Sequence, residues 1–489
     1  MRTMLRTGGR RVKGSRKPEP DPGEPDHPQK GGRKLSVSGV SRRARDIVSG
    51  KGDSAKAQRM ALFTFGVRVF GAALAYFLQV FLARWMGSHE YGIYVVVWTI
   101  VIVLGVIAPL GFNSSVQRLI PEYLAFDRLD LLRGILSASR TIAMVSATAL
   151  MLVTMAVVWF SSGHVPDYYI VPAYLAALCL PMFTLTDVQE GIARSRDWGD
   201  LAIMPTYIWR PFLILVVVLV ASLTGLPHTA TTACLAAILA TWVAALYQKI
   251  SMDRRLRHLV GPGPARWAPG DWMRLSLPIF LVEGFFTLLT SADVLMVSYF
   301  EPPGEVAVYY AAAKTLALVH FVYFAVKAAS AHRYSRLHHS GDHEGLAVYV
   351  RQSVGWTFWP SLLFAGLLLV FGSYILRLFG SDFAGGHNIL AFLLVGVLAR
   401  AAVGPVDALL TMAGEQKRCA VAYAGAFAVN VALNVTLIPY FGLIGAALAT
   451  SISMCFEASS LFWVARRRLG ISSFIWTGHR SGKRTTHGE

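Results

Sequence analysis

The stretch TSADVLMVSYFEPPGEVAVYYAAAKTLAL, residues 290–318, decides the fold. It consists of two apolar segments joined by a short polar turn, with Asp293 deep in the first segment and Lys314 in the second. A charged side chain in the middle of a bilayer costs several kcal/mol, and it is normally paired or faces a polar cavity. The stretch therefore predicts two membrane-spanning helices whose buried charges have a specific role.

The composition of the whole chain agrees with this prediction. Of its 489 residues, 54% are hydrophobic and 15% are charged, whereas soluble domains average about 25% charged residues. Apolar stretches of about 18 or more residues recur, which is typical of spanning helices, and the alternating pattern of a β-barrel is not seen. Because a bilayer forces each segment to satisfy its own backbone hydrogen bonds, we predict an all-α integral membrane protein. Twelve spans are expected near 60–83, 92–117, 141–160, 168–187, 201–223, 229–248, 274–299, 306–330, 353–376, 385–411, 418–438 and 441–464.

The formal charge of +18 lies mostly outside the spans. Residues 1–59 hold 16 Lys and Arg against 6 acids, and residues 465–489 hold 6 against 1. With the N-terminus placed inside, the tails and inner loops carry 39 Lys and Arg, and the outer loops carry two. The positive-inside rule therefore predicts that both termini are cytoplasmic. The basic tails are expected to face anionic membrane lipids rather than nucleic acid.

The domain organisation follows from where the apolar segments stop. Glycines, prolines and arginines mark a linker near the middle, and the two flanking halves show a weak parallel repeat in which Glu90 matches Glu305 and Tyr94 matches Tyr309. Such repeats build two related bundles with a cleft between them. We expect a disordered basic tail, a six-helix bundle, a cytoplasmic linker, a second six-helix bundle and a second basic tail, at residues 1–58, 59–249, 250–272, 273–465 and 466–489 respectively.

Several stretches resemble one family of bacterial membrane proteins. They are GVRVFGAALAYFLQVFLARWMGSHEYGIYVVV, GFNSSVQRLIPEYLA, MRLSLPIF, ADVLMVSYFEPPGEVAVYYAAAKT and AGEQKRCAVAYAGAFAVNVALNVTLIPYFGLIGAALATSIS. Their order and spacing resemble the polysaccharide-biosynthesis flippases of the Wzx type, in the multidrug/oligosaccharidyl-lipid/polysaccharide exporter superfamily. The resemblance runs along roughly residues 60–465 and implies a MATE-like flippase fold of two pseudo-symmetric six-helix bundles.

The resemblance also implies a function. These proteins translocate undecaprenyl-diphosphate-linked oligosaccharide repeat units across the bacterial cytoplasmic membrane by alternating access, for O-antigen, capsule or exopolysaccharide. A lipid-linked glycan is then the substrate, and polysaccharide polymerase and glycosyltransferases are expected partners. The related multidrug exporters, which are cation antiporters of the MATE type, share the fold and remain the alternative.

An enzyme is not expected, because every predicted outer loop is short and holds no paired acids. The chain has no P-loop, and neither a metal site nor a cofactor is predicted.

Four buried cations are candidates for substrate binding: Arg68, Arg210, Arg400 and Lys314. Arg68 and Arg210 lie about eight or nine residues inside the first and fifth spans, which at 1.5 Å per residue is about 12–14 Å deep. Arg400 is placed in the middle of the tenth span. A guanidinium there suits a diphosphate, since its planar fork binds phosphate oxygens bidentately. A structural ion pair or a snorkelling side chain is the open alternative for each.

Three buried acids are candidates for ion coupling or for a buried pair. Asp293 and Lys314 lie at depths that differ by about 3 Å, so an ion pair between them is expected, acting either as a switch or as a static strut. Glu283 and Asp407 are candidates for a proton or cation site. Arg400 and Asp407 are seven residues apart and are expected on one face of one helix.

Overall fold

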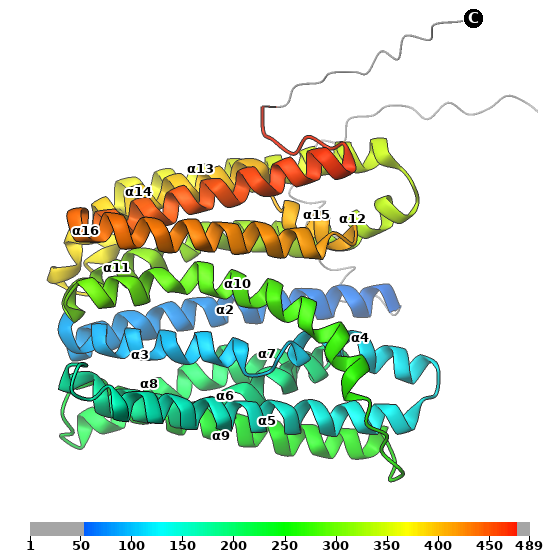
Figure 1. Cartoon of the computed structure of the whole chain (residues 1–489), viewed down its shortest axis with the longest axis horizontal. Helices are drawn as coiled ribbons and strands as arrows, with labels where there is room; N and C mark the ends of the chain where they lie inside the picture. The colour runs from blue at the N-terminus through cyan, green and yellow to red at the C-terminus, as the bar shows by residue number, and fades with distance from the viewer. Residues whose placement is uncertain (1–52, 477–489) are drawn as a thin grey trace, which may run out of the picture. The chain divides into compact units, whose positions relative to one another are not determined.

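The computed structural model describes residues 53–476, which Figure 1 shows as long helices running roughly parallel. No strand occurs in that part of the chain. Its helices are α2 (Asp53–Met86), α3 (Ser88–Ile107), α4 (Phe112–Ala125), α5 (Leu129–Phe160), α6 (Asp167–Arg194), α7 (Gly199–Met204), the π-helix η1 (Pro205–Trp209), α8 (Arg210–Leu223), α9 (Ala230–Leu259), α10 (Pro269–Phe300), α11 (Pro303–Thr315), α12 (Ala317–His339), α13 (His343–Leu376), the 3-10 helix η2 (Ser381–Gly386), α14 (His387–Val403), α15 (Val406–Met412) and α16 (Gln416–Leu469).

Eleven of the described helical segments are long and apolar enough to cross a membrane. The last, α16, has 54 residues and breaks at Gly442, whose φ of 54° lies in the left-handed region that favours glycine. Asn430 Nδ2 donates to Ser453 Oγ at 3.2 Å across the break, so α16 is a hairpin of two arms, 416–441 and 443–469. The predicted all-α membrane fold is confirmed, and α16 supplies two of its spans.

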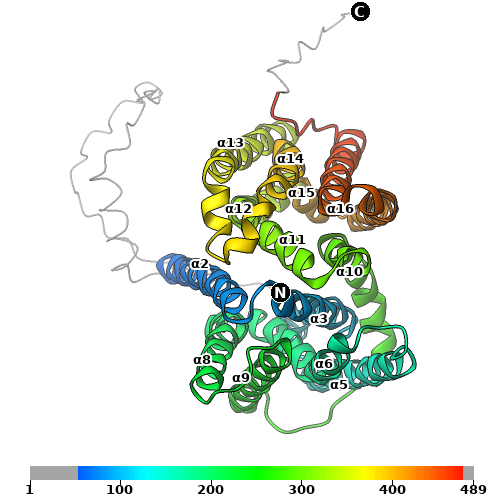
Figure 2. The same ribbon diagram turned by 90° about the vertical axis from the view of Figure 1, so that its left-hand side faces the viewer.

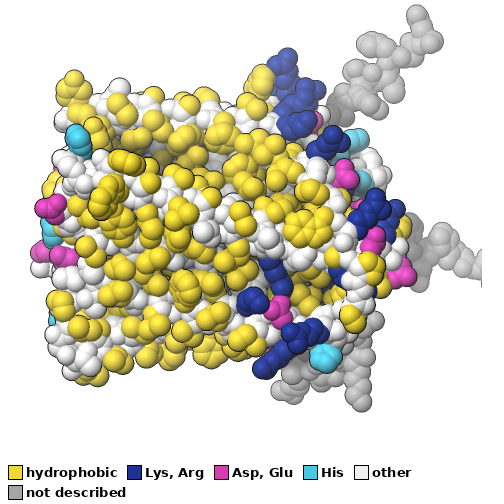
Figure 3. All heavy atoms as spheres, turned by 60° about the horizontal axis from the view of Figure 1, so that its bottom comes forward, with side chains coloured by type: hydrophobic (Ala, Val, Ile, Leu, Met, Phe, Trp, Pro, Cys, Tyr) yellow, Lys and Arg dark blue, Asp and Glu magenta, His cyan; other side chains and the backbone are white. Residues whose placement is uncertain are grey.

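The sides of the molecule are apolar. In Figure 3, hydrophobic side chains cover the middle of the visible face, and Lys and Arg gather toward one end. Large apolar side chains on several helices are exposed, among them Leu152, Val220, Leu363 and Val370. Exposed apolar surface of this extent suits contact with lipid tails, and together with the eleven segments able to cross a membrane it identifies the chain as a multi-pass membrane protein.

Viewed along the helices in Figure 2, α5, α6, α8 and α9 lie on one side, and α12 to α16 lie on the other. Helices α3 and α11, which correspond in the predicted repeat, meet in the centre. A Cβ atom on Gly92 would lie 1.8 Å from the carbonyl oxygen of Pro303, so only glycine allows these two backbones to approach this closely.

One large apolar cluster joins the two halves of the chain at one end. One buried cluster combines side chains from both halves, such as Leu82, Tyr91, Val306 and Phe379. It surrounds the turn at Gly87 and the turn between α10 and α11, and we call this the closed end. At the opposite end, which we call the open end, the buried clusters are separate, and the cluster of the N-terminal half takes in Trp272 at the start of α10. The halves therefore pack together broadly at the closed end, and at the open end the start of α10 still packs against the N-terminal half.

Three expectations about boundaries need correction. The tenth span does not run through 385–411, because Gly404 (φ 73°) and Pro405 end α14 and α15 follows as a separate short helix. Most of the linker predicted at 250–272 is helical, since α9 extends to Leu259 and α10 begins at Pro269.

The expected C-terminal tail also begins later than predicted. Helix α16 extends to Leu469, and Ile475 N then donates to Ala402 O at 3.1 Å. The tails predicted at 1–58 and 466–489 otherwise lie mostly outside the described residues.

Candidate functional site

A cavity of about 1110 Å³ lies between the N-terminal half (66–259) and the C-terminal half (269–476). Its wall is formed by α2, α3, η1 and α8 from the first half and by α10, α11, α12, α15 and α16 from the second. On the closed side it reaches Gln79 and Tyr94, and toward the open end it reaches Met412 and Gln416. The cavity therefore occupies the space where the two halves part.

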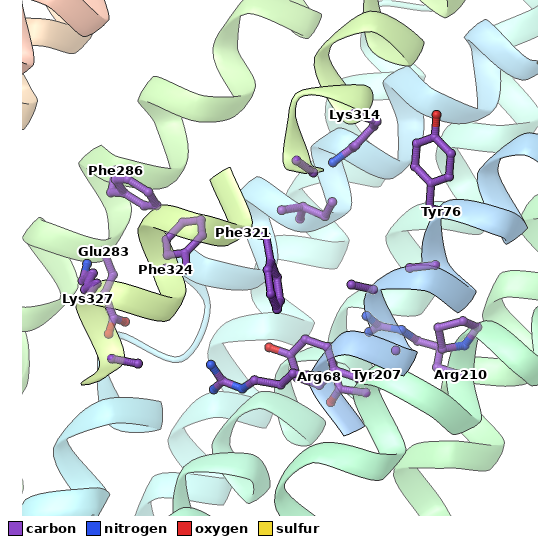
Figure 4. Close-up of a pocket in the computed structure, with 18 of the residues that line it drawn as sticks. Arg68, Tyr76, Tyr207, Arg210, Glu283, Phe286, Lys314, Phe321, Phe324 and Lys327 are labelled. Atoms are coloured by element: carbon purple, nitrogen blue, oxygen red, sulfur yellow. The ribbon is translucent and has the colours of Figure 1, made fainter. Parts of the chain in front are cut away.

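Two arginines enter the cavity from the N-terminal half. Arg210 begins α8 directly after the π-helix η1, and π-helical turns often occur at functional sites. Its guanidinium carbon lies 5.0 Å from the ring centroid of Phe183 and 5.9 Å from that of Trp98. Arg68 projects from α2 (Figure 4). Aromatic faces hold a cation in place without neutralising it.

The C-terminal half contributes two lysines in different settings. Lys314, on α11, lies 4.8 Å from the ring centroid of Tyr310. Lys327, on α12, forms an ion pair with Asp407 of α15 at 2.5 Å. Tyr323 and Tyr423 also donate to Asp407, at 2.7 and 3.2 Å. Asp407 is thus a buried carboxylate held by one cation and two hydroxyls.

Glu283 is the second carboxylate in the cavity wall, and it links the two halves. It projects from α10 and accepts hydrogen bonds from Asn113 Nδ2 at 3.3 Å and Ser114 Oγ at 2.5 Å. Both donors lie at the start of α4 in the other half.

The cavity wall has an excess of positive charge. Its wall holds four cations and two acids, and Lys327 and Asp407 offset each other. Among the residues that the structure describes, no carboxylate oxygen lies within 4.0 Å of Arg68, Arg210 or Lys314. Opposite charges compensate buried cations in most membrane proteins, so these three leave the cavity able to accept an anion.

Arg400 and Asp293, two of the predicted site residues, lie outside the cavity wall. Arg400 is 5% exposed and pairs with Glu457 at 3.3 Å, and its guanidinium lies 4.5 Å from the ring centroid of Tyr323. The break at Gly404 also separates Arg400 from Asp407, so the expected shared helical face is wrong. The structural ion pair, which the sequence left open for Arg400, is the arrangement found.

The expected ion pair between Asp293 and Lys314 is also wrong. Asp293 accepts hydrogen bonds from Tyr309 Oη at 2.7 Å and Thr450 Oγ1 at 3.4 Å, deep between α10, α11 and α16. Tyr309 and Lys314 are five residues apart, about 140° around α11. The two charges have similar depth in the sequence but point in different directions.

The aromatic lining was not predicted. Tyr76, Tyr94, Trp98 and Tyr310 line the cavity from α2, α3 and α11, and Phe321 and Phe324, labelled in Figure 4, line it from α12. Tyrosine and tryptophan in membrane helices are enriched at the two interfaces. Tyr76 and Trp98 lie seven and six residues inside the nearer ends of their predicted spans, and this placement was the available signal. Aromatic faces and unpaired cations together suit an amphiphile with an anionic group. Over the described residues, no group of three or more potential metal ligands was found.

Solved transporter structures share this fold. An inward-facing multidrug resistance MATE family transporter of the MOP superfamily is 16% identical, with 83% of this chain and 98% of that chain covered and a TM-score of 0.67. The lipid II flippase MurJ, in an inward closed conformation, is 15% identical, with 83% and 87% covered and a TM-score of 0.66. An MOP superfamily transporter from Pyrococcus furiosus is 14% identical, with 89% and 99% covered and a TM-score of 0.63. These likenesses show that the chain has the fold of these transporters.

Two family profiles match the sequence. Residues 278–436 match the MatE family. Residues 58–331, more than half of the chain, match the family described as Polysaccharide biosynthesis protein. The chain belongs to the polysaccharide biosynthesis protein family. No curated protein matches it.

Proposed function

We propose that the protein is a flippase that moves undecaprenyl-diphosphate-linked oligosaccharide repeat units across the bacterial cytoplasmic membrane for surface polysaccharide synthesis. One observation carries the proposal: Arg68, Arg210 and Lys314 line the cavity and have no carboxylate within 4.0 Å in the described chain. A diphosphate supplies the missing negative charge, and a guanidinium binds its oxygens in bidentate geometry.

The size and lining of the cavity support a large glycolipid head. Pockets for drug-sized ligands measure roughly 300–1,000 Å³, and this cavity reaches about 1110 Å³. Aromatic faces such as Trp98 and Tyr310 offer flat apolar surfaces for sugar rings. The undecaprenyl chain stays in the surrounding lipid, which suits a substrate that only partly enters the protein.

Alternating access supplies the movement in this proposal. The halves pack together broadly at the closed end, and toward the open end the cavity lies between them beside the start of α10. With both termini in the cytoplasm, as the positive-inside rule predicts, the open end faces the leaflet where the lipid-linked glycan is made. The two proposed bundles, 59–249 and 273–465, would then rock about the contact between α3 and α11. Polymerase and glycosyltransferases are the proposed partners.

Glu283, Asp293 and Asp407 are the proposed groups for ion coupling or its structural support. Asp407 is best placed to respond to substrate, because Lys327 lines the same cavity. A diphosphate that attracts Lys327 weakens its hold on Asp407 and leaves that carboxylate to bind a proton or cation. Arg400, paired with Glu457 beside this group, is proposed to act through the C-terminal half rather than by touching substrate.

A multidrug and cation antiporter of the MATE type is the second candidate. Two observations favour it: the MatE match at 278–436 and the presence of Glu283 and Asp407 in the cavity wall. Acidic groups there would bind cationic drugs. The excess of cations in the wall favours the flippase.

Deletion of the gene in its own host tests the proposal against this alternative. We expect loss of one surface polysaccharide and accumulation of its lipid-linked repeat unit, both restored by a plasmid copy, with unchanged sensitivity to cationic drugs. Normal surface polysaccharide together with increased drug sensitivity would overturn the flippase and favour the exporter.

A further inference from the structure

A second, smaller hollow lies outside the transport cavity, where the two arms of α16 meet at the open end. It measures about 290 Å³ and is lined by Arg418, Trp463, Val464, Arg467 and Arg468. None of these residues lines the large cavity. Both arms of α16 stand at the margin of the molecule in Figure 2, and Trp463, Arg467 and Arg468 are exposed.

Three arginines from the two arms converge on this hollow. Arg418, near the start of the first arm, forms an ion pair with Glu415. Arg467, near the end of the second arm, places its guanidinium 4.9 Å from the ring centroid of Trp463. Arg467 and Arg468 have no carboxylate oxygen within 4.0 Å in the described chain. The hollow therefore keeps a positive charge beside an exposed indole.

An apolar track leads from the hollow toward the middle of the membrane. On the second arm, Ile452, Phe456 and Trp463 are exposed, and they lie within about 40° of one another around the helix. On the first arm, Gly425 leaves room for Phe456, since a Cβ atom there would lie 3.2 Å from that ring. The two arms thus form a shallow groove with a cationic end and an apolar remainder.

We propose that this groove binds one anionic glycerophospholipid, with its phosphodiester among Arg418, Arg467 and Arg468 and an acyl chain along Phe456 and Ile452. Basic pockets between membrane helices hold the headgroups of anionic lipids. Tryptophan sits at the level of these headgroups because its ring is apolar and its N–H is polar. The groove has positive charge at one end and apolar side chains along the rest, as a phospholipid has a charged headgroup and an apolar chain. The site therefore suits an amphiphile rather than a free anion.

Native mass spectrometry of the full-length, detergent-purified protein tests this site. Phosphatidylglycerol and phosphatidylethanolamine with the same acyl chains are titrated separately. We expect the tightest lipid to be phosphatidylglycerol. The double variant Arg467→Gln/Arg468→Gln should weaken it by about fivefold per arginine, or about 25-fold, with little change for phosphatidylethanolamine.

The matched control is Arg254→Gln/Arg257→Gln. It also removes two exposed arginines, which lie near the C-terminal end of α9 and outside the groove. It should keep the tight phosphatidylglycerol. Equal weakening in both double variants, or equal binding of the two lipids to the wild type, would overturn the site. Displacement of phosphatidylglycerol by millimolar inorganic phosphate would assign the arginines to a free anion and would overturn the lipid proposal.

Discussion

Replacing Arg210 with glutamine removes the cation most firmly placed in the cavity. Its guanidinium lies 5.0 Å from the Phe183 ring centroid and 5.9 Å from that of Trp98, and no carboxylate oxygen lies within 4.0 Å of it in the described chain. The variant should therefore fold. A hydrogen bond to a charged partner contributes about 1.5–3 kcal/mol. Its loss predicts transport of a lipid diphosphate that is about 10- to 150-fold slower at limiting substrate.

The assay compares initial transport rates in proteoliposomes that contain equal amounts of folded protein. Arg210→Lys should be intermediate, because it keeps the charge but loses the fork that binds two phosphate oxygens. Arg257→Gln, an exposed arginine on α9 outside the cavity, is the matched control and should transport at the wild-type rate. A wild-type rate for Arg210→Gln would remove this residue from the substrate path and refute the reasoning.

Two further predictions concern the closed end. Gly92→Ala places a methyl group 1.8 Å from Pro303 O, so it should destabilise the protein by about 1–3 kcal/mol or more, seen as a lower midpoint of thermal unfolding. Gly66→Ala, with no atom within 4 Å of the new Cβ, should not lower that midpoint, because alanine favours a helix over glycine, and an equal decrease in both variants would contradict the close contact of α3 with α11. Ser88 Oγ lies 3.3 Å from Asp382 Oδ2 across the halves. A Ser88→Cys/Asp382→Cys pair joined by a short thiol crosslinker should therefore stop transport until it is cleaved, and undiminished transport by the crosslinked protein would count against alternating access.

The membrane fold could be read from the sequence because its cause is local. A bilayer requires each spanning segment to be apolar and to satisfy its own backbone, so composition along the chain locates the helices. The reversal at Gly442 was located in the same way to within a few residues, since the predicted turn lay between spans at 418–438 and 441–464. The break after α14 was missed, although the Gly404–Pro405 dipeptide is a common helix terminator. Continuous hydrophobicity through 385–411 outweighed that signal.

The candidate site was only partly predictable, because depth in a span says nothing about direction around the helix. Arg68 and Arg210 were judged by depth and do line the cavity. Asp293 and Lys314 were judged in the same way, but Tyr309 and Thr450 take the carboxylate while Lys314 lies over Tyr310. Tyr309 and Tyr310 lie in the same hairpin, but depth alone does not show which of them faces each charge, and Thr450 comes from a helix distant in the chain.

Transport of a lipid-linked oligosaccharide by the purified protein is the most direct test of the central claim. Proteoliposomes carry a fluorescent undecaprenyl-diphosphate oligosaccharide from the host, and a membrane-impermeant quencher reports the fraction in the outer leaflet over time. The account predicts that the protein exchanges this lipid between leaflets far faster than protein-free liposomes do, and that Arg210→Gln slows the exchange. Exchange no faster than in protein-free liposomes, with a cationic drug carried by the same preparation, would contradict it.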